Sequence, residues 1–62
     1  MYEVVVSGCV ERTLHATLDD LQVGWPAVPG THSMSVVDQS QLVAVVARLN
    51  EAGIVIEAVR RL

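Results

Sequence analysis

The chain has 62 residues, enough for one domain, and 52 % of them are hydrophobic. Its net charge of −3, with four arginines and no lysine, excludes the basic surface that nucleic-acid binding needs, and the two aromatic residues are too few to stack bases. No apolar run approaches the roughly 18 residues of a membrane span, and residues 1–20 lack a basic start followed by an apolar segment, so we expect a cytoplasmic protein.

A chain of this length is expected to be only marginally stable. A domain of about 60 residues buries only about 60 % of the surface that its unfolded chain exposes. Disulfides, a metal or an oligomer usually supply the missing stability. Cys9 is the single cysteine and the sequence shows no cluster of metal ligands. We therefore predict no cofactor, no metal and a homo-oligomer, most simply a dimer.

The first two elements differ in how clearly the sequence indicates them. Tyr2 to Ser7 is a β-branched run bounded by Gly8, which predicts a strand. Residues 10–20 fit a helical stripe, with apolar residues at spacings of four, four and three, but they also show strand-like alternation around Ala16. Helices run longer than strands, and neighbouring parallel strands in one sheet need a crossover segment between them. We therefore predict that residues 10–20 form a helix.

A hairpin is predicted next. Residues 21–25 form its first arm, residues 26–30 its loop and residues 31–37 its second arm. Pro29-Gly30 is typical of a type II turn, since proline fixes φ and glycine accepts a positive φ. The second arm alternates between apolar and small polar residues, as a half-buried strand does.

The C-terminal half carries the strongest pattern. Asp38 is placed to cap a helix, with Gln41 where a capping box requires a Gln or Glu side chain. Apolar residues recur at helical spacing as far as Ala52, and Gly53 supplies the left-handed residue that ends the helix. A closing strand that follows from Ile54 completes a β-α-β order.

Together these elements predict a single α+β domain over residues 1–62. Its topology is the ferredoxin-like β-α-β-β-α-β sandwich, with a four-stranded antiparallel sheet and both helices on one face. The predicted core lies between the two layers and consists of Val4, Val6, Leu14, Leu18, Met34, Val36, Leu42, Val46, Leu49 and Ile56.

The sheet face away from the helices is a candidate surface for self-association. It would be semi-apolar and without bulky side chains, carrying Val5, Val55 and Val59 among the polar residues Glu3, Ser33, Ser35 and Glu57. Trp25 opens the hairpin loop and is a further candidate interface residue, because an exposed tryptophan is a natural anchor for a partner. The same ring could instead cover the edge of the core.

The junction between the first strand and the first helix is a candidate ligand site. It consists of Ser7, Gly8 and Cys9, and a thiol at a helix N-terminus can become reactive. The position is similar to that of heavy-metal-binding domains, whose loop carries two cysteines two residues apart. Val6 and Arg12 occupy the positions at that spacing here, so the second thiolate is missing. A small packing residue is the simpler interpretation of Cys9.

His15 and His32 are the candidates for proton transfer. In a helix over residues 10–20, Glu11, His15 and Asp19 form a row at i, i+4 and i+8, but the outer face of any surface helix produces the same row. His32 lies on the inward-facing side of the second hairpin arm, close to its start, where the ring can also reach water.

Residues 30–62 resemble a group of small uncharacterised bacterial α/β proteins. The matching segments are Val36-Val37-Asp38-Gln39, Leu49-Asn50-Glu51-Ala52-Gly53-Ile54 and Ala58-Val59-Arg60-Arg61. They form the start of the helix, its end and the closing strand. The resemblance therefore implies the same α/β fold, and it carries over no activity and no catalytic residue.

These observations predict a small self-associating binding or regulatory accessory protein without catalytic activity. One alternative is a sensor domain that binds a small ligand at a dimer interface near Gly8. A second is a small enzyme of the dimeric α/β-barrel kind, with His15 or His32 as the proton-transfer residue. Both alternatives rest on analogy of fold.

Overall fold

The computed structural model describes residues 1–27 and 32–62, and the predicted turn at Pro29-Gly30 lies outside them. The described residues form the elements β1 (Tyr2–Ser7), α1 (Glu11–Thr17), β2 (Ser33–Val36), α2 (Gln39–Glu51) and β3 (Val55–Arg61). The helix predicted over residues 10–20 is confirmed in its central part, as are the strands at both ends of the chain.

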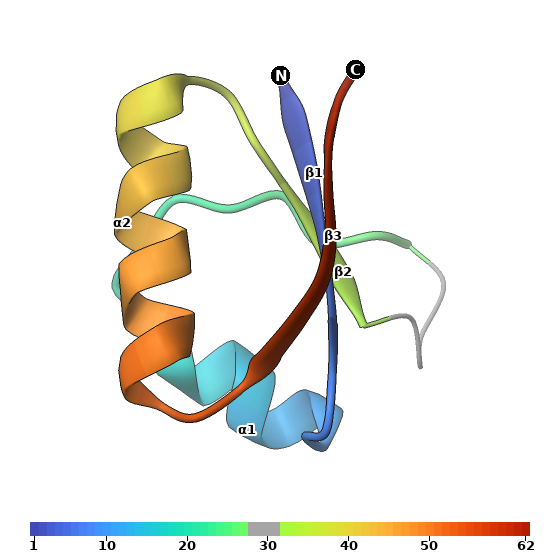
Figure 1. The fold of residues 1–62 in the computed structure, drawn as a ribbon, viewed down its shortest axis with the longest axis vertical. Coiled ribbons are helices and arrows are strands. Elements are labelled where there is room, and N and C mark those ends of the chain that lie inside the picture. Colours follow the sequence, from blue (N-terminus) through green and yellow to red (C-terminus); the bar gives the residue numbers. More distant parts are fainter. Residues whose placement is uncertain (28–31) are drawn as a thin grey trace.

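The sheet has β1 in the middle, paired antiparallel with β2 on one side and with β3 on the other. Figure 1 shows the sheet along its edge, with β3 in front and both helices on the same side of it. We call the other side, which no described helix covers, the helix-free face. The strand registers assign to it Glu3, Val5, Ser7, Ser33, Ser35, Val55, Ala58 and Arg60.

The prediction of a four-stranded ferredoxin-like sheet is wrong, because the described residues form an α+β fold with three strands. The expected fourth strand, residues 21–25, meets the sheet through an isolated antiparallel bridge between Gly24 and Ser35. The bridge has both of its backbone hydrogen bonds. The N–H of Gly24 donates to the carbonyl of Ser35 at 2.7 Å, and the N–H of Ser35 donates back at 2.8 Å.

Missing donors on both sides explain why the bridge does not extend into a strand. Hydrogen-bonded pairs recur every second residue in an antiparallel ladder, so pairs next to Gly24 and Ser35 would involve Pro26 on one side and Val37 on the other. Proline has no N–H to donate. The N–H of Val37 already donates to Oε1 of Gln41 at 3.2 Å. The pairing is therefore limited to one bridge.

The capped helix predicted from Asp38 onward is confirmed. Oδ1 of Asp38 accepts a hydrogen bond from the N–H of Gln41 at 2.8 Å. The Gln41 side chain in turn reaches back to Val37, which completes a reciprocal cap. Gly53 adopts φ +74° after the last turn, as the glycine stop requires.

The core lies between β1, β2 and the two helices. Its buried hydrophobic residues are Val4, Val6, Leu14, Leu18, Met34, Val36, Val45, Leu49 and Ile54. Val45 occupies the buried helical position that was predicted for Val46, which is half-buried. Leu42 and Ile56, also predicted in the core, are half-buried against it.

A β-bulge in the pairing of β1 with β3 changes which residues face the helices. Glu57 is an extra residue in β3 with no partner in the register of β1. As a result Val59 lies opposite Val4 and projects toward the helix side. The strict alternation used for the prediction had placed Val59 on the helix-free face.

An ion pair joins α2 to the segment that follows α1. The guanidinium of Arg48 donates to Oδ1 and Oδ2 of Asp20 at 2.6 and 3.0 Å, and also to the carbonyl of Thr17 at 3.2 Å. These hydrogen bonds from Arg48 lower the pKa of the Asp20 carboxyl below its ordinary value, and Asp20 raises the pKa of Arg48. Both side chains are at the surface, where water and salt screen the pair.

The pair predicts a pH dependence of stability. Because the pKa of Asp20 is lower in the folded chain, its ionisation stabilises the fold above the ordinary value of 3.8, and the contribution is lost as the pH falls through the folded pKa. Denaturant unfolding should therefore show the unchanged chain more stable than Asp20→Asn at about pH 7, with a smaller difference at about pH 2. Asp19→Asn removes the same charge next to the pair and should show a smaller difference. An Asp20→Asn difference that is equal at both pH values would contradict the assignment.

Candidate functional site

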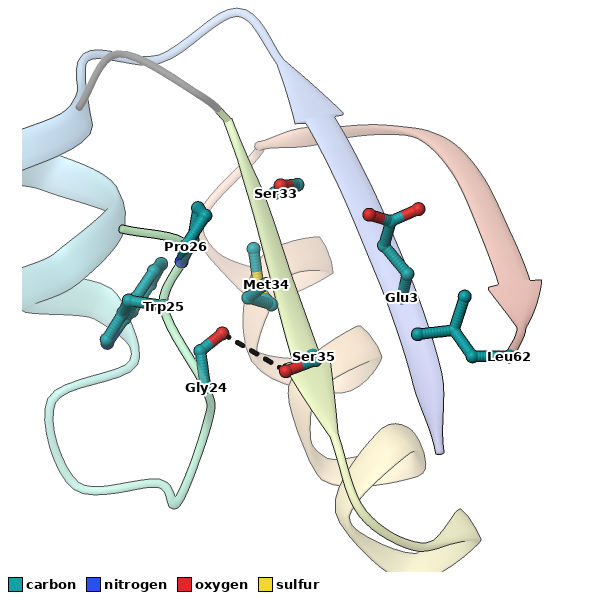
Figure 2. A pocket seen from close by; sticks show the side chains of 8 residues that line it. All are labelled: Glu3, Gly24, Trp25, Pro26, Ser33, Met34, Ser35 and Leu62. Atoms are coloured by element: carbon teal, nitrogen blue, oxygen red, sulfur yellow. Dashed lines mark hydrogen bonds between the residues drawn. The ribbon is translucent and has the colours of Figure 1, made fainter. Parts of the chain in front are cut away.

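The helix-free face carries a shallow hollow of about 180 Å³ near the β2 edge. We call it the outer hollow, and it is lined by Glu3, Gly24, Trp25, Pro26, Ser33, Met34, Ser35 and Leu62. Figure 2 shows Trp25 and Pro26 on one side of β2, and Glu3 and Leu62 on the other side. The two serines of β2 lie between these walls. The hollow is therefore open to solvent and has mixed apolar and polar walls.

The bridge to β2 fixes the first wall of the outer hollow. Gly24 is held against Ser35 by the two backbone hydrogen bonds of the bridge, and the Ser35 hydroxyl also donates to the Gly24 carbonyl at 3.4 Å. A Cβ on residue 24 would lie 2.5 Å from the Ser35 Oγ, so the close approach favours glycine. Trp25 follows directly and is thereby placed at the sheet edge.

A stacked aromatic pair holds the Trp25 ring from the helix side. The rings of Trp25 and His15 have centroids 3.9 Å apart and an interplanar angle of 25°. His15 belongs to α1, and its Nε2 lies 3.7 Å from Oε1 of Glu11 one turn earlier. Of the row predicted from helical spacing, Glu11 and His15 lie on α1, whereas Asp19 lies beyond its last residue, Thr17. No pattern in the sequence indicates that Trp25 joins them, because the contact depends on the path of the chain after α1.

The charged side chain that lines the outer hollow, Glu3, is paired with an arginine of the neighbouring strand. Glu3 on β1 accepts from Nε of Arg60 on β3 at 2.8 Å, and a second nitrogen of the same guanidinium also contacts this carboxylate. Ser33 is buried and Ser35 is half-buried. The lining therefore offers a neutralised carboxylate, two hydroxyls and two apolar walls.

The two histidines predicted as candidates for proton transfer lie outside the outer hollow. Neither His15 nor His32 is among the residues that line the outer hollow, and His15 lies behind the Trp25 ring. A serine needs an adjacent general base to act as a nucleophile. Within the lining residues the ionisable group is Glu3, which Arg60 already engages.

The ligand site predicted at the first strand–helix junction lies outside the outer hollow. The Ser7 hydroxyl donates to Oε1 of Glu57 at 2.5 Å, and Gly8 turns the chain with φ +79°. Cys9 is half-buried and packs against the core. None of these three residues lines the outer hollow.

The predicted interface residues lie on two different faces of the sheet. Val5 is central on the helix-free face, opposite Ser33, and Val55 is on the same face at the far end of β3 with 55 % of its surface exposed. Val59 is 45 % exposed but projects toward the helix side. Trp25 is half-buried at the β2 edge.

His32 immediately precedes β2 and is half-buried, and its carbonyl accepts a hydrogen bond from the N–H of Val6 at 2.9 Å.

The described parts of the chain hold no group of three or more His, Cys, Asp and Glu side chains arranged to bind a metal ion. They also contain no helix with the length and hydrophobicity needed to cross a membrane.

Sequence reasoning placed Glu3, Ser33 and Ser35 on the same face by alternation, and the structure brings them together. It missed Gly24, Pro26 and Leu62 as lining residues. Gly24 and Pro26 read as hairpin residues, and no sequence pattern indicates how closely they approach β2. Leu62 follows the bulge, which shifts the alternation of the closing strand.

No protein-family model, curated protein or solved structure matches this chain. The resemblance of residues 30–62 to small bacterial α/β proteins therefore stays a prediction.

The contact between Trp25 and His15 yields a fluorescence prediction. Trp25 is the single tryptophan, so its emission reports on this site alone. His15→Ala should shift the emission toward longer wavelength, because the ring gains contact with water, and should cost about 1 kcal/mol of unfolding free energy. His32→Ala removes the other histidine and should leave the emission unchanged. Identical spectra for the unchanged chain and His15→Ala would show that the stack does not form in solution.

Proposed function

We propose that the protein is a small self-associating binding domain without catalytic activity, working in the cytoplasm as an accessory to another protein. The observation that carries the proposal is the helix-free face. It combines the outer hollow, an exposed Val55 and the neutralised pair of Glu3 and Arg60 on one side of the sheet.

Several properties of this face support binding. Trp25 is an aromatic side chain held in place by a bridge and a stacked ring, so little conformational freedom is lost when a partner covers it. Leu62 is 65 % exposed on the opposite wall. An apolar centre with a polar surround is the usual anatomy of a protein interface.

Self-association is supported by the small size of the core. Nine buried hydrophobic residues hold the described part of a 62-residue chain, and domains of this size are commonly stabilised by assembly. Large apolar residues also remain exposed on α2 and on β3, among them Val43, Val55 and Val59.

Sedimentation equilibrium tests the proposal. The average molecular mass should rise with protein concentration, from the 6.7 kDa of one chain toward twice that value. Added salt should change the association little if apolar burial drives it. A mass of 6.7 kDa at every concentration up to about 1 mM, where even a weak dimer would be populated, would contradict self-association.

A further inference from the structure

We propose that two copies of the chain associate by pairing their β3 strands antiparallel about a two-fold axis at Val59, which joins the two sheets into one. This inference deepens the self-association proposed above and rests on it. It names the surface that the second copy occupies and leaves the helix-free face available to a different partner.

The first support is the open edge of β3. Within the described residues, β3 has a paired neighbour on one side only, whereas the far side of β2 is occupied at Gly24 by the bridge. In Figure 1 the open edge faces the viewer, and β3 runs in front of the other two strands. A seven-residue edge strand with a free side is a template for another strand.

The second support is the direction of the β3 backbone groups. The N–H of Leu62 donates to the carbonyl of Met1 at 2.9 Å, so Leu62 is in a hydrogen-bonded pair with β1. Such pairs alternate along an antiparallel ladder, and the groups of the residues between them point away. Arg61 and Val59 therefore direct their N–H and C=O groups to the open edge. These are the groups that a second strand needs.

The third support is an apolar strip beside that edge. Val59 projects to the helix side and keeps 45 % of its surface exposed, although Val4 lies opposite it. On α2, Arg48 reaches across toward α1, and helical spacing puts Val43 and Val46 on the other flank, the flank nearer β3. Val43 is 63 % exposed. A second copy related by the axis would cover this strip with its own.

The fourth support is that the charges favour the register with the axis at Val59 over an axis at Arg60 or Glu57. Glu57 and Ala58 both project to the helix-free face because of the bulge, as the hydrogen bond from Ser7 to Glu57 shows. With the axis at Val59, Arg60 of one copy lies opposite Ala58 and beside Glu57 of the second copy. An axis at Arg60 or at Glu57 would put like charges opposite each other, which is unfavourable.

Face-to-face packing of two helix-free faces fits less well. Their centre would bring the paired Glu3 and Arg60 of each copy into the interface, and burying an ion pair gives little net stability. Pairing through β3 leaves Glu3 at the surface. It also satisfies backbone groups that are otherwise bonded to water.

Val59→Pro is the main test. Proline lacks the N–H that would bond across the axis, and the fold should survive because that N–H is not used in the ladder with β1. The variant should keep the circular dichroism of the folded chain while its dimer dissociates at about tenfold or more higher concentration in sedimentation equilibrium. Val55→Arg, at an exposed position of the helix-free face that lies outside the residues paired about Val59, should leave the dimer unchanged.

Glu57→Arg provides a second test that leaves the backbone intact. It places an arginine beside Arg60 of the second copy, and the two-fold axis repeats this contact. The repulsion between like charges should weaken association by about tenfold. Glu51→Arg makes the same charge change at an exposed position of α2, on the flank away from β3, and is the matched control. It should associate more tightly than Glu57→Arg.

The outcomes separate this inference from the proposed function. A chain that is monomeric throughout overturns both. If folded Val59→Pro still forms the dimer and Val55→Arg dissociates it, the pairing of β3 is overturned and self-association is left standing. If Val59→Pro does not fold, equal association of Glu57→Arg and Glu51→Arg overturns the pairing.

Discussion

The double hydrogen bond between Gly24 and Ser35 is the interaction on which the rest of the arrangement depends. It brings the segment after α1 to the edge of β2, and so it places Trp25 where the ring meets His15 and forms one wall of the outer hollow. It also occupies part of the β2 edge. The edge of β3 is left as the fully open edge of the described sheet.

The sheet therefore presents two surfaces of different character. The helix-free face has fixed side chains, a hollow and a neutralised ion pair, which suits recognition of a partner by shape. The β3 edge has unpaired backbone groups and an apolar strip, which suits strand addition. The outer hollow opens on the helix-free face, whereas the proposed pairing uses the edge of β3. One copy can therefore pair with another while its hollow remains accessible. The proposed self-association and the proposed binding are then compatible in one small domain.

Local patterns in the sequence were sufficient for most elements. The cap at Asp38 and the glycine stop at Gly53 depend on neighbours a few residues away, and both form as predicted. The prediction of a fourth strand was wrong because pairing needs free backbone donors. The N–H of Val37 donates to the side chain of Gln41, and Pro26 has no N–H. The predicted face of Val59, the stack of Trp25 on His15 and the full lining of the outer hollow depend on contacts between distant segments, which spacing in the sequence does not encode.

Amide hydrogen exchange along β3 tests the central claim most directly. In a single copy, the N–H groups of Ala58 and Arg60 point to β1, and those of Val59 and Arg61 point to solvent. Pairing of β3 with β3 predicts that Val59 and Arg61 become protected as the concentration is raised, while Ala58 and Arg60 are protected throughout. Rapid exchange of Val59 and Arg61 in a sample shown to be dimeric would contradict the account.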